Sequence, residues 1–350
     1  MAQVFGEQGT TDLPANPPRV SALKSRLCVI SPCYNEAPGI ADFVQRLAAV
    51  ADGMPDFRWE FILVDDGSHD DSLQCLKALS SQEPRLTVVA LSRNFGHQSA
   101  LSAGISLARG DAIICLDSDL QHPPELIPQM VGLWQQGFDL VSMVRISSER
   151  AGWLKRCSSW LFYKLLNAIS DTPVPAGVAD FFLASRPVYR ALRRCPERHR
   201  FVRGLVSWVG FRRTFLEYRS PPRNTGASKY GLPQMWKLAT DAAFAFSTSP
   251  IRLMSRLGVG VSGLGLLYLG YVLVRRLVHH DVVPGWASTL GCLLILGGLN
   301  LLFMGVLGEY VARVYEEVKA RPVYLVREVF PSRARRRRRP AGSEGSSSSG

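Results

Sequence analysis

Short apolar runs and longer amphipathic stretches alternate through the first half of the chain. The apolar runs are typical of strands buried on both faces of a sheet, and they span Leu27–Ser31, Phe61–Val64, Leu86–Leu91, Ala112–Leu116 and Leu140–Val144. The stretches between them have helical periodicity and include Ile40–Ala51, Asp71–Ser80 and Ser99–Ala108. This alternation predicts an α/β fold whose sheet is doubly wound and mostly parallel.

The last third of the chain has a different pattern, in which apolar residues run on without a charge. Leu257–Val274 is an uncharged segment of 18 residues and Trp286–Leu307 is one of 22. Each is long enough to cross a hydrocarbon core of ~30 Å, although a buried core helix has the same signature. The connector Arg275–Gly285 is too short to form a domain, so the two segments predict a membrane hairpin.

Basic residues flank this hairpin and predict its orientation. They are Arg252, Arg256, Arg313, Lys319, Arg321 and Arg327. By the positive-inside rule both flanks are cytoplasmic, which predicts a multi-pass protein of the cytoplasmic (inner) membrane. Arg275 and Arg276 in the short turn oppose this orientation but are outnumbered.

The charge and cysteine content exclude several classes of protein. The 350 residues carry a formal charge of +12, part of which comes from Arg333 and Arg335–Arg339 in a Gly- and Ser-rich tail. That tail could contact anionic lipids or be solvated, and it comes with no nucleic-acid reading module. Seven scattered cysteines without a Cys-x-x-Cys pair argue against a disulfide framework and a zinc site. No apolar run precedes Leu27, so we expect no secretory signal.

Acidic turns follow three of the predicted strands. They are Pro32–Glu36, Asp65–Asp70 and Asp117–Asp119. The carboxyl ends of parallel strands meet at one edge of a sheet, where ligands of such folds bind. Two carboxylates about 4 Å apart repel each other by roughly 4 kcal/mol at an effective dielectric of 20, and a bound cation relieves this repulsion. Because Mg²⁺ prefers one or two carboxylates plus substrate phosphates, the pattern predicts a metal site for a phosphorylated ligand.

Residues beside these turns extend the predicted site. Gln121 can add a carbonyl oxygen to the metal, whereas we expect His122 to be a solvated turn residue, because oxygen-rich sites favour harder cations. His97 and Gln98 begin a helix close to the same edge. For His97, a role near the ligand and a hydrogen-bonded structural role both remain open.

A basic region precedes the membrane hairpin. Twelve Arg or Lys residues lie between Arg186 and Lys229, against only Glu197 and Glu217. Arginine forks suit bidentate contacts with phosphate, and lysine serves as a point charge. The region could therefore receive an anionic lipid head group, or simply face anionic lipids. Residues 152–169 look like an aromatic-rich helix that lies either in the membrane interface or in a core.

Four motifs in this order match a known family. They are Pro32-x-Tyr34-Asn35-Glu36, Asp65-Asp66-Gly67-Ser68-x-Asp70, Arg93-Asn94-Phe95-Gly96-His97-Gln98 and Asp117-x-Asp119-Leu-Gln121-x-Pro-Pro-Glu125. The chain resembles the polyprenyl-phosphate glycosyltransferases of glycosyltransferase family two, which include bactoprenol glucosyltransferases and dolichol-phosphate mannosyltransferases. The resemblance runs from about Leu27 to Tyr324, and the hairpin favours the bactoprenol branch.

The resemblance implies a GT-A-type sheet followed by a two-helix transmembrane hairpin, and it assigns roles to residues. Those expected to hold the nucleotide sugar are Pro32, Tyr34, Glu36, Leu63, Asp65 and Asp66. Those expected to hold Mg²⁺ or Mn²⁺ are Asp117, Asp119 and Gln121. Those expected at the diphosphate or the acceptor phosphate are Arg145, Arg223, Ser228 and Lys229.

The implied reaction is inverting transfer of one sugar from a nucleotide diphosphate sugar, by resemblance UDP-glucose, to a polyprenyl phosphate, by resemblance undecaprenyl phosphate. A phosphate monoester with a second pKa near 6 is already largely ionised, so no indispensable base is expected. Besides Asp119, the catalytic candidate is Asp180, which heads Asp180-Phe181-Phe182-Leu183 where many members have Asp-Phe-Arg-Leu. Phe182 thus removes a possible phosphate or carboxylate partner and puts the donor and the role of Asp180 in question.

The resemblance also predicts how the chain is divided. The expected parts are a disordered lead (1–25), a cytoplasmic glycosyltransferase domain (26–232), juxtamembrane interfacial helices (233–256), two transmembrane helices within 257–312 (about 257–276 and 286–307), a cytoplasmic segment (313–330) and a disordered basic tail (331–350). Association of copies through the transmembrane helices is a further expectation.

Two other functions compete with this interpretation. A processive polysaccharide synthase shares the sheet but has a Gln-x-x-Arg-Trp motif and more spans, which this chain lacks. A non-catalytic protein that binds sugar nucleotides at the membrane would fit Phe182. The intact pair Asp117 and Asp119 argues against that second alternative.

Overall fold

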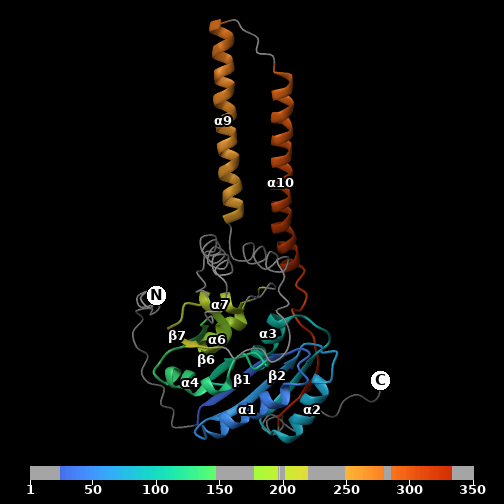
Figure 1. Ribbon diagram of the computed structural model, residues 1–350, viewed down its shortest axis with the longest axis vertical. Helices are drawn as coiled ribbons and strands as arrows, with labels where there is room; N and C mark the ends of the chain where they lie inside the picture. The colour runs from blue at the N-terminus through green and yellow to red at the C-terminus, as the bar shows by residue number, and fades with distance from the viewer. Residues whose placement is uncertain are drawn as a thin grey trace, which may run out of the picture. The chain divides into compact units, whose positions relative to one another are not determined.

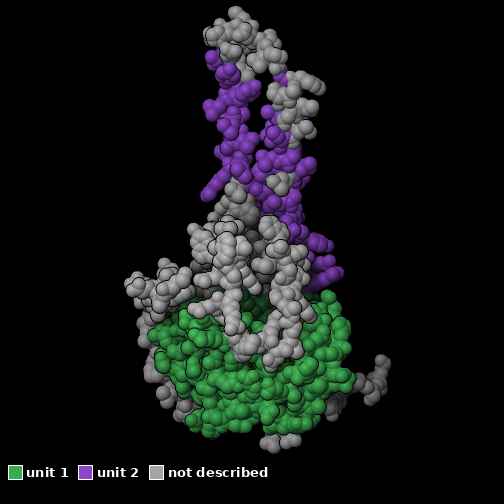
Figure 2. Space-filling view, viewed as in Figure 1, with its two compact units in different colours: residues 1–153, 174–227, 322–350 green, residues 154–173, 228–321 purple. Residues whose placement is uncertain are grey.

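The computed structural model describes residues 24–146, 177–195, 197, 202–219, 249–279 and 285–332. The chain forms two compact units, which Figure 2 colours separately. The first comprises residues 1–153, 174–227 and 322–350, and the second comprises residues 154–173 and 228–321. The first unit contains the sheet, and the second contains two long helices (Figure 1).

A sheet of eight strands in the order β7-β5-β6-β4-β1-β2-β3-β8 organises the first unit. In chain order the strands are β1 (Arg26–Cys33), β2 (Arg58–Asp65), β3 (Leu86–Leu91), β4 (Ala112–Cys115), β5 (Leu140–Arg145), β6 (Val178–Ser185), β7 (Arg213–Tyr218) and β8 (Val326–Phe330). The central strands β4, β1, β2 and β3 are mutually parallel, whereas β6 and β8 run antiparallel to β4 and β3. The α/β fold is confirmed, with antiparallel strands added on both sides of its parallel centre.

Helices cover both faces of this sheet because side chains of a strand point alternately to its two faces. Leu27 and Val29 of β1 pack in one apolar cluster, and Cys28 and Ile30 pack in a second cluster on the opposite face. The first face carries α1 (Ile40–Asp52), α2 (Ser72–Gln82) and α4 (Ile127–Gln135), and the second carries α3 (His97–Leu107), α6 (Arg186–Arg194) and α7 (Val202–Trp208) (Figure 1). Burial on both faces explains why the strands read as continuous apolar runs.

The last described segment of the chain returns to the sheet of the first unit. β8 pairs with β3, and the backbone N–H of Ser92 donates to the carbonyl oxygen of Leu325 at 2.9 Å. The hydroxyl of Tyr324 donates to Ser106 Oγ at 2.7 Å. The segment is therefore anchored beside the loop that follows β3.

Two long helices, α9 (Ser249–His279) and α10 (Trp286–Val318), form the described part of the second unit and contact each other. The apolar segments expected at 257–276 and 286–307 lie inside them. Among the described residues, one helical stretch is long and apolar enough to cross a membrane. It is Ile295–Val318, with mean hydropathy 1.6 and none of it buried.

Candidate active site

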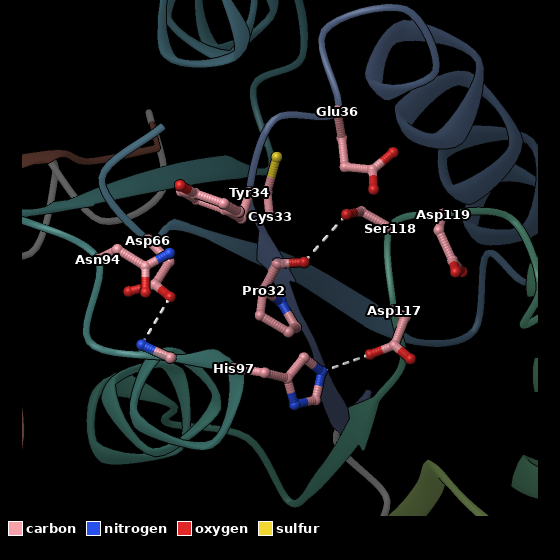
Figure 3. Close-up of a pocket in the computed structure, with 11 residues that line it drawn as sticks. Pro32, Cys33, Tyr34, Glu36, Asp66, Asn94, His97, Asp117, Ser118 and Asp119 are labelled. Carbon is pink, nitrogen blue, oxygen red and sulfur yellow. Dashed lines mark hydrogen bonds and ion pairs between the residues drawn. The ribbon is translucent and has the colours of Figure 1, made fainter. Parts of the chain in front are cut away.

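A pocket of about 250 Å³ opens where β1, β2 and β4 end (Figure 3). The register places Cys33 of β1 opposite Asp65 of β2, so the turns after these parallel strands meet at one edge, as predicted. The lining residues are Pro32, Cys33, Tyr34, Glu36, Asp66, Asn94, Gly96, His97, Asp117, Ser118 and Asp119. The predicted convergence of acidic turns is therefore present.

The turns after β1 and β2 are joined to each other. Asn35 adopts a φ of +55°, which asparagine tolerates better than most residues. Its side-chain oxygen accepts from the backbone N–H of His69 at 2.9 Å, and its own N–H donates to Ser68 Oγ at 3.0 Å. Tyr34 is 39% exposed and meets the His69 ring edge-on at 6.3 Å. The joined turns thus present an aromatic ring at the rim of the pocket.

The adjacent acids at the end of β2 have different surroundings. Both oxygens of Asp66 accept backbone N–H groups, from Phe95 at 2.8 Å and Gly96 at 2.9 Å. Burial raises the pKa of Asp66, although these two hydrogen bonds oppose the rise. Asp65 is fully buried, and its Oδ1 has no hydrogen-bond partner in the described part of the chain. Asp66 therefore holds the loop after β3, whereas Asp65 keeps one oxygen without a hydrogen-bond partner in the described part of the chain.

Gly67 allows the loops after β2 and β3 to touch. Its φ is +67°, and a Cβ placed there would lie 2.4 Å from the carbonyl carbon of Arg93 and 2.6 Å from the backbone nitrogen of Asn94. Both neighbours are backbone atoms, which a side-chain rotation cannot move away. Only glycine satisfies both the conformation and the contact.

The turn after β4 is strained at one residue. Leu120 has a φ of +61°, a conformation that costs a non-glycine residue about 1–3 kcal/mol. The surroundings hold it in place, because Ser118 Oγ donates to the carbonyl of Pro32 at 3.0 Å and Asp119 Oδ1 accepts from the backbone N–H of Gln121 at 3.0 Å. The strain lies between Asp119 and Gln121, two residues expected at the metal.

Two histidines flank Asp117. His97 Nε2 lies 2.6 Å from Asp117 Oδ1, and the backbone N–H of Asp117 donates to His122 Nδ1 at 3.0 Å. Burial would raise the pKa of Asp117, but the hydrogen bond from His97 and the nearby cationic groups outweigh it and lower that pKa. Burial would by itself lower the pKa of His97. The hydrogen bond to Asp117 and the negative charge of Asp117 outweigh burial and raise the pKa of His97.

His122 is not the solvated turn residue that we expected. It is only 6% exposed and stacks on Phe181 with ring centroids 5.3 Å apart. Burial lowers the pKa of His122, despite the opposing charges of Asp117 and Asp119. A neutral ring fits its role as an acceptor for the backbone of Asp117. The expectation failed because the preference of oxygen-rich sites for harder cations says only that His122 is a poor metal ligand, whereas its ring packs against Phe181 of β6.

The predicted residues beyond the pocket fall in three places. Gln121 is 8% exposed, and its side-chain oxygen accepts from Arg145 at 3.3 Å. Leu63 and Asp65 are buried within β2, behind the pocket wall. Outside the described residues lie Arg223, Ser228 and Lys229, together with the aromatic-rich segment 152–169.

Asp180 has an arginine partner, although Phe182 does not supply one. Arg203 of α7 binds its carboxylate through two donors, Nε at 3.1 Å and Nη2 at 2.7 Å. Phe182 is 2% exposed and packs in the apolar cluster shared by α3 and α7. The position two residues after Asp180 is thus part of the core in this chain.

Four further residues line the pocket, although the sequence assigned them no role: Cys33, Asn94, Gly96 and Ser118. Their only signal in the sequence is that each lies within a selected motif. Burial and the neighbouring charges of Asp65 and Glu36 raise the pKa of the Cys33 thiol to about 12. This thiol is therefore protonated and unreactive at neutral pH.

Comparison with known proteins assigns the chain to a family. Residues 28–193 match the family model described as glycosyl transferase family 2, and residues 249–314 match the GtrB C-terminal hairpin. YkcC of Bacillus subtilis, a protein named as a glycosyltransferase, is 40% identical over 302 residues, which cover 86% of this chain and 93% of that relative. The chain belongs to glycosyl transferase family 2.

Other members of glycosyl transferase family 2 match over the same length. The bactoprenol glucosyl transferase of Shigella phage SfII is 37% identical over 87% of this chain and 98% of its own. A prophage bactoprenol glucosyl transferase homolog of Escherichia coli is 35% identical over 87% of this chain and 99% of its own. Among solved structures, mannosyl-3-phosphoglycerate synthase from Rubrobacter xylanophilus is similar with a TM-score of 0.45 at 17% identity, covering 66% of this chain and 75% of its own.

The donor set of this family 2 chain fits a hard divalent cation. Asp117 and Asp119 both line the pocket and offer carboxylate oxygens. Among the described residues, no group of three or more His, Cys, Asp or Glu side chains is arranged to hold a metal ion by itself. An open pair of carboxylates suits Mg²⁺ or Mn²⁺, which complete their coordination with substrate phosphates and water.

Proposed function

We propose that this protein is a membrane-bound, inverting glycosyltransferase that transfers one sugar from a nucleotide diphosphate sugar to a polyprenyl phosphate at the cytoplasmic face of the membrane. UDP-glucose and undecaprenyl phosphate are the proposed donor and acceptor. The observation that carries the proposal is the pocket in which the exposed ring of Tyr34 and the carboxylates of Asp117 and Asp119 converge. Full-length relatives named bactoprenol glucosyl transferase support it at 35–37% identity.

The nucleoside of the donor would bind at the end formed by β1 and β2. The exposed ring of Tyr34 offers a flat surface on which a base can stack, a contact worth about 1–3 kcal/mol. Asp65 Oδ1 is buried and has no partner in the described residues, so it can accept from an N–H of the base or a ribose hydroxyl. Pro32, Glu36 and Leu63 would complete this part of the site.

The diphosphate would bind beside the turn after β4. Asp117 and Asp119, with Gln121 behind them, would hold Mg²⁺ or Mn²⁺, which stabilises negative charge on a leaving diphosphate. Arg145 lies next to this group through its hydrogen bond to Gln121 at 3.3 Å. A guanidinium at that distance is placed to contact a phosphate oxygen.

The acceptor would bring its own nucleophile. A polyprenyl phosphate is largely dianionic at neutral pH, so it can attack without losing a proton to a side chain. Asp180 already accepts two hydrogen bonds from Arg203, which suits a fixed carboxylate better than a proton acceptor. Arg223, Ser228 and Lys229 are proposed as further phosphate contacts, and α9 and α10 are proposed as the multi-pass membrane anchor.

An assay with the full-length protein in lipid nanodiscs tests this proposal. The protein would be incubated with Mn²⁺, a polyprenyl phosphate and, separately, UDP-glucose, UDP-galactose, UDP-N-acetylglucosamine and GDP-mannose. Mass spectrometry should detect a polyprenyl-phosphate hexose with UDP-glucose and release of UDP. Absence of any glycolipid with all four donors would refute the enzymatic function, and a product with another donor alone would refute the choice of sugar.

A further inference from the structure

We propose that Gln98, Asp180 and Arg203 are positioning residues that act through His97. Together Gln98, Asp180 and Arg203 form a polar clasp, which fixes the ring of His97 against the pocket carboxylate of Asp117. The clasp joins the start of α3, the strand β6 and the start of α7. This inference rests on the proposed function, because it assigns the clasp a role in that reaction.

The orientation of the Gln98 amide follows from one backbone contact. The N–H of Val202 at the start of α7 donates to Gln98 Oε1 at 2.9 Å, and a backbone N–H can only donate. The carbonyl oxygen of Gln98 must therefore face Val202, and its NH₂ group must face the opposite side. On that side lie Asp180 Oδ2 at 3.4 Å and His97 Nδ1 at 3.3 Å.

The orientation of Gln98 in turn selects the tautomer of His97. Because the NH₂ group of Gln98 has only hydrogens to offer, His97 Nδ1 has to accept and therefore carries no proton. The ring hydrogen is then on Nε2, which lies 2.6 Å from Asp117 Oδ1 and donates to it (Figure 3). Gln98 thus directs the only N–H of a neutral ring toward Asp117.

Arg203 secures the far end of the clasp. Asp180 is 9% exposed, and removing the partner of a buried carboxylate is strongly destabilising. The two donors of Arg203 at 3.1 and 2.7 Å hold both oxygens of this carboxylate, which keeps Oδ2 facing Gln98. Phe182 lies in the apolar cluster and supplies no charge to Asp180. The guanidinium that pairs with Asp180 comes instead from Arg203, 23 positions further along the chain.

The clasp is important because Asp117 lies at the reacting end of the pocket. Without Gln98, the His97 ring can rotate or carry its hydrogen on Nδ1, and Asp117 then loses a donor that fixes its carboxylate. A misplacement of about 1 Å in an active site can reduce the rate about 100-fold. The loss should affect the rate of transfer more than binding of the donor, because Tyr34, the proposed stacking surface for the nucleoside, comes from the turn after β1 and not from the turn after β4.

The test measures two quantities in the full-length protein, the transfer kinetics and the tautomer of His97. Gln98→Met removes the amide at similar size, Arg203→Gln removes the charge, and Arg203→Lys retains one donor. Gln74→Met and Arg194→Gln are matched controls, because both residues are exposed on other helices. The tautomer is determined from ¹⁵N shifts of the histidine rings, with His97 assigned through its absence in His97→Asn.

We expect Gln98→Met and Arg203→Gln to lower kcat about 100-fold with the KM for the donor within about twofold, and Arg203→Lys to recover part of the loss. Measured at a pH high enough for the His97 ring to be neutral, its hydrogen should be on Nε2 in the wild type, and this preference should be lost in Gln98→Met. The proposal is overturned if kcat of both variants stays within threefold of the controls, or if the tautomer is the same in Gln98→Met. A wild type without transferase activity refutes the proposed function instead, and the tautomer measurement still tests the clasp.

Arg203→Gln could also unfold the protein, since it leaves Asp180 buried without its partner. Thermal unfolding of each variant separates this effect from a loss of positioning. Gln98→Met leaves the ion pair of Asp180 and Arg203 in place, so it should unfold close to the wild-type temperature. A folded Gln98→Met with wild-type kcat is sufficient to reject the clasp.

Discussion

The two sides of the pocket are built in different ways. On one side, the turns after β1, β2 and β4 each place several site residues within a few consecutive positions. On the other side, His97 lines the pocket and is held from behind by the clasp of Gln98, Asp180 and Arg203, which are separated by 82 and 23 positions. The first side depends on parallel strands whose ends coincide, and the second depends on how α7 packs against β6.

This difference explains which functions each side can support. The strand ends offer carboxylates and an aromatic ring to a ligand. The side chains of the clasp form hydrogen bonds to one another, to His97 and to the backbone of Val202. We infer that the strand ends bind the substrate, and that the clasp orients the residues at these strand ends. Substitutions on the two sides should therefore lower kcat by unequal amounts.

The largest effect is expected at the strand ends. Asp119→Asn keeps the size of the side chain and removes the charge that would hold the cation on the diphosphate. Loss of one group that stabilises transition-state charge costs about 10²–10³-fold, so we expect kcat to fall about 1,000-fold in the nanodisc assay. Asp56→Asn, at an exposed acid, is the control. If Asp119→Asn were less harmful than Gln98→Met, the assignment of binding and orienting sides would be reversed.

The same difference decides how much could be predicted from the sequence. The ranges of β1 to β5 were predicted to within a few residues, because burial on both faces leaves a continuous apolar run. The strand-end residues were selected because each acidic turn directly follows such a run. No comparable signal marks Arg203, whose relation to Asp180 exists only after α7 has packed.

The strands β6, β7 and β8 were not predicted, for physical reasons that differ. Arg213–Tyr218 is half-buried at the edge of the sheet, with side chains mostly of intermediate exposure, so no long apolar run marks it. Val326–Phe330 is largely exposed and contains two adjacent charged residues, Arg327 and Glu328. Its place beside β3 depends on pairing across more than 230 positions, which local periodicity does not reveal.

A substitution at Gly67 tests how far the strand-end side depends on its backbone. In Gly67→Ala the new Cβ would lie 2.4 Å from the backbone of Arg93, and the residue would also have to keep a φ of +67°. The strain of that conformation and the overlap together should lower the free energy of unfolding by about 3 kcal/mol.

Gly39→Ala is the matched control for this substitution, since a Cβ there meets nothing within 4 Å. Chemical unfolding followed by tryptophan fluorescence would measure both variants. Equal stability of the two alanine variants would show that the loops after β2 and β3 can separate at little cost. The strand-end side would then be less rigid than its contacts indicate.

The smallest effect is expected at Glu125, although it belongs to one of the four motifs. Arg46 of α1 donates two hydrogen bonds to its carboxylate, at 2.7 and 2.8 Å, but the Glu125 side chain is 53% exposed. Exposed ion pairs contribute about 0.2–1 kcal/mol, so Glu125→Gln should lower stability by less than 1 kcal/mol and leave kcat close to wild type.

The contribution of the ion pair between Arg46 and Glu125 to stability changes with pH in a defined direction. The hydrogen bond from Arg46 lowers the pKa of Glu125 below its usual value of 4.5. The unfolded state therefore binds the proton more readily, and the contribution is complete above pH 4.5 and lost as the pH falls below it. The difference in unfolding free energy between wild type and Glu125→Gln should shrink from pH 7 to pH 3, with Glu316→Gln as an exposed control. A large loss of kcat in Glu125→Gln would mean that this motif acts on the substrate through Glu125, and the strand-end side would then extend to the helix that follows β4.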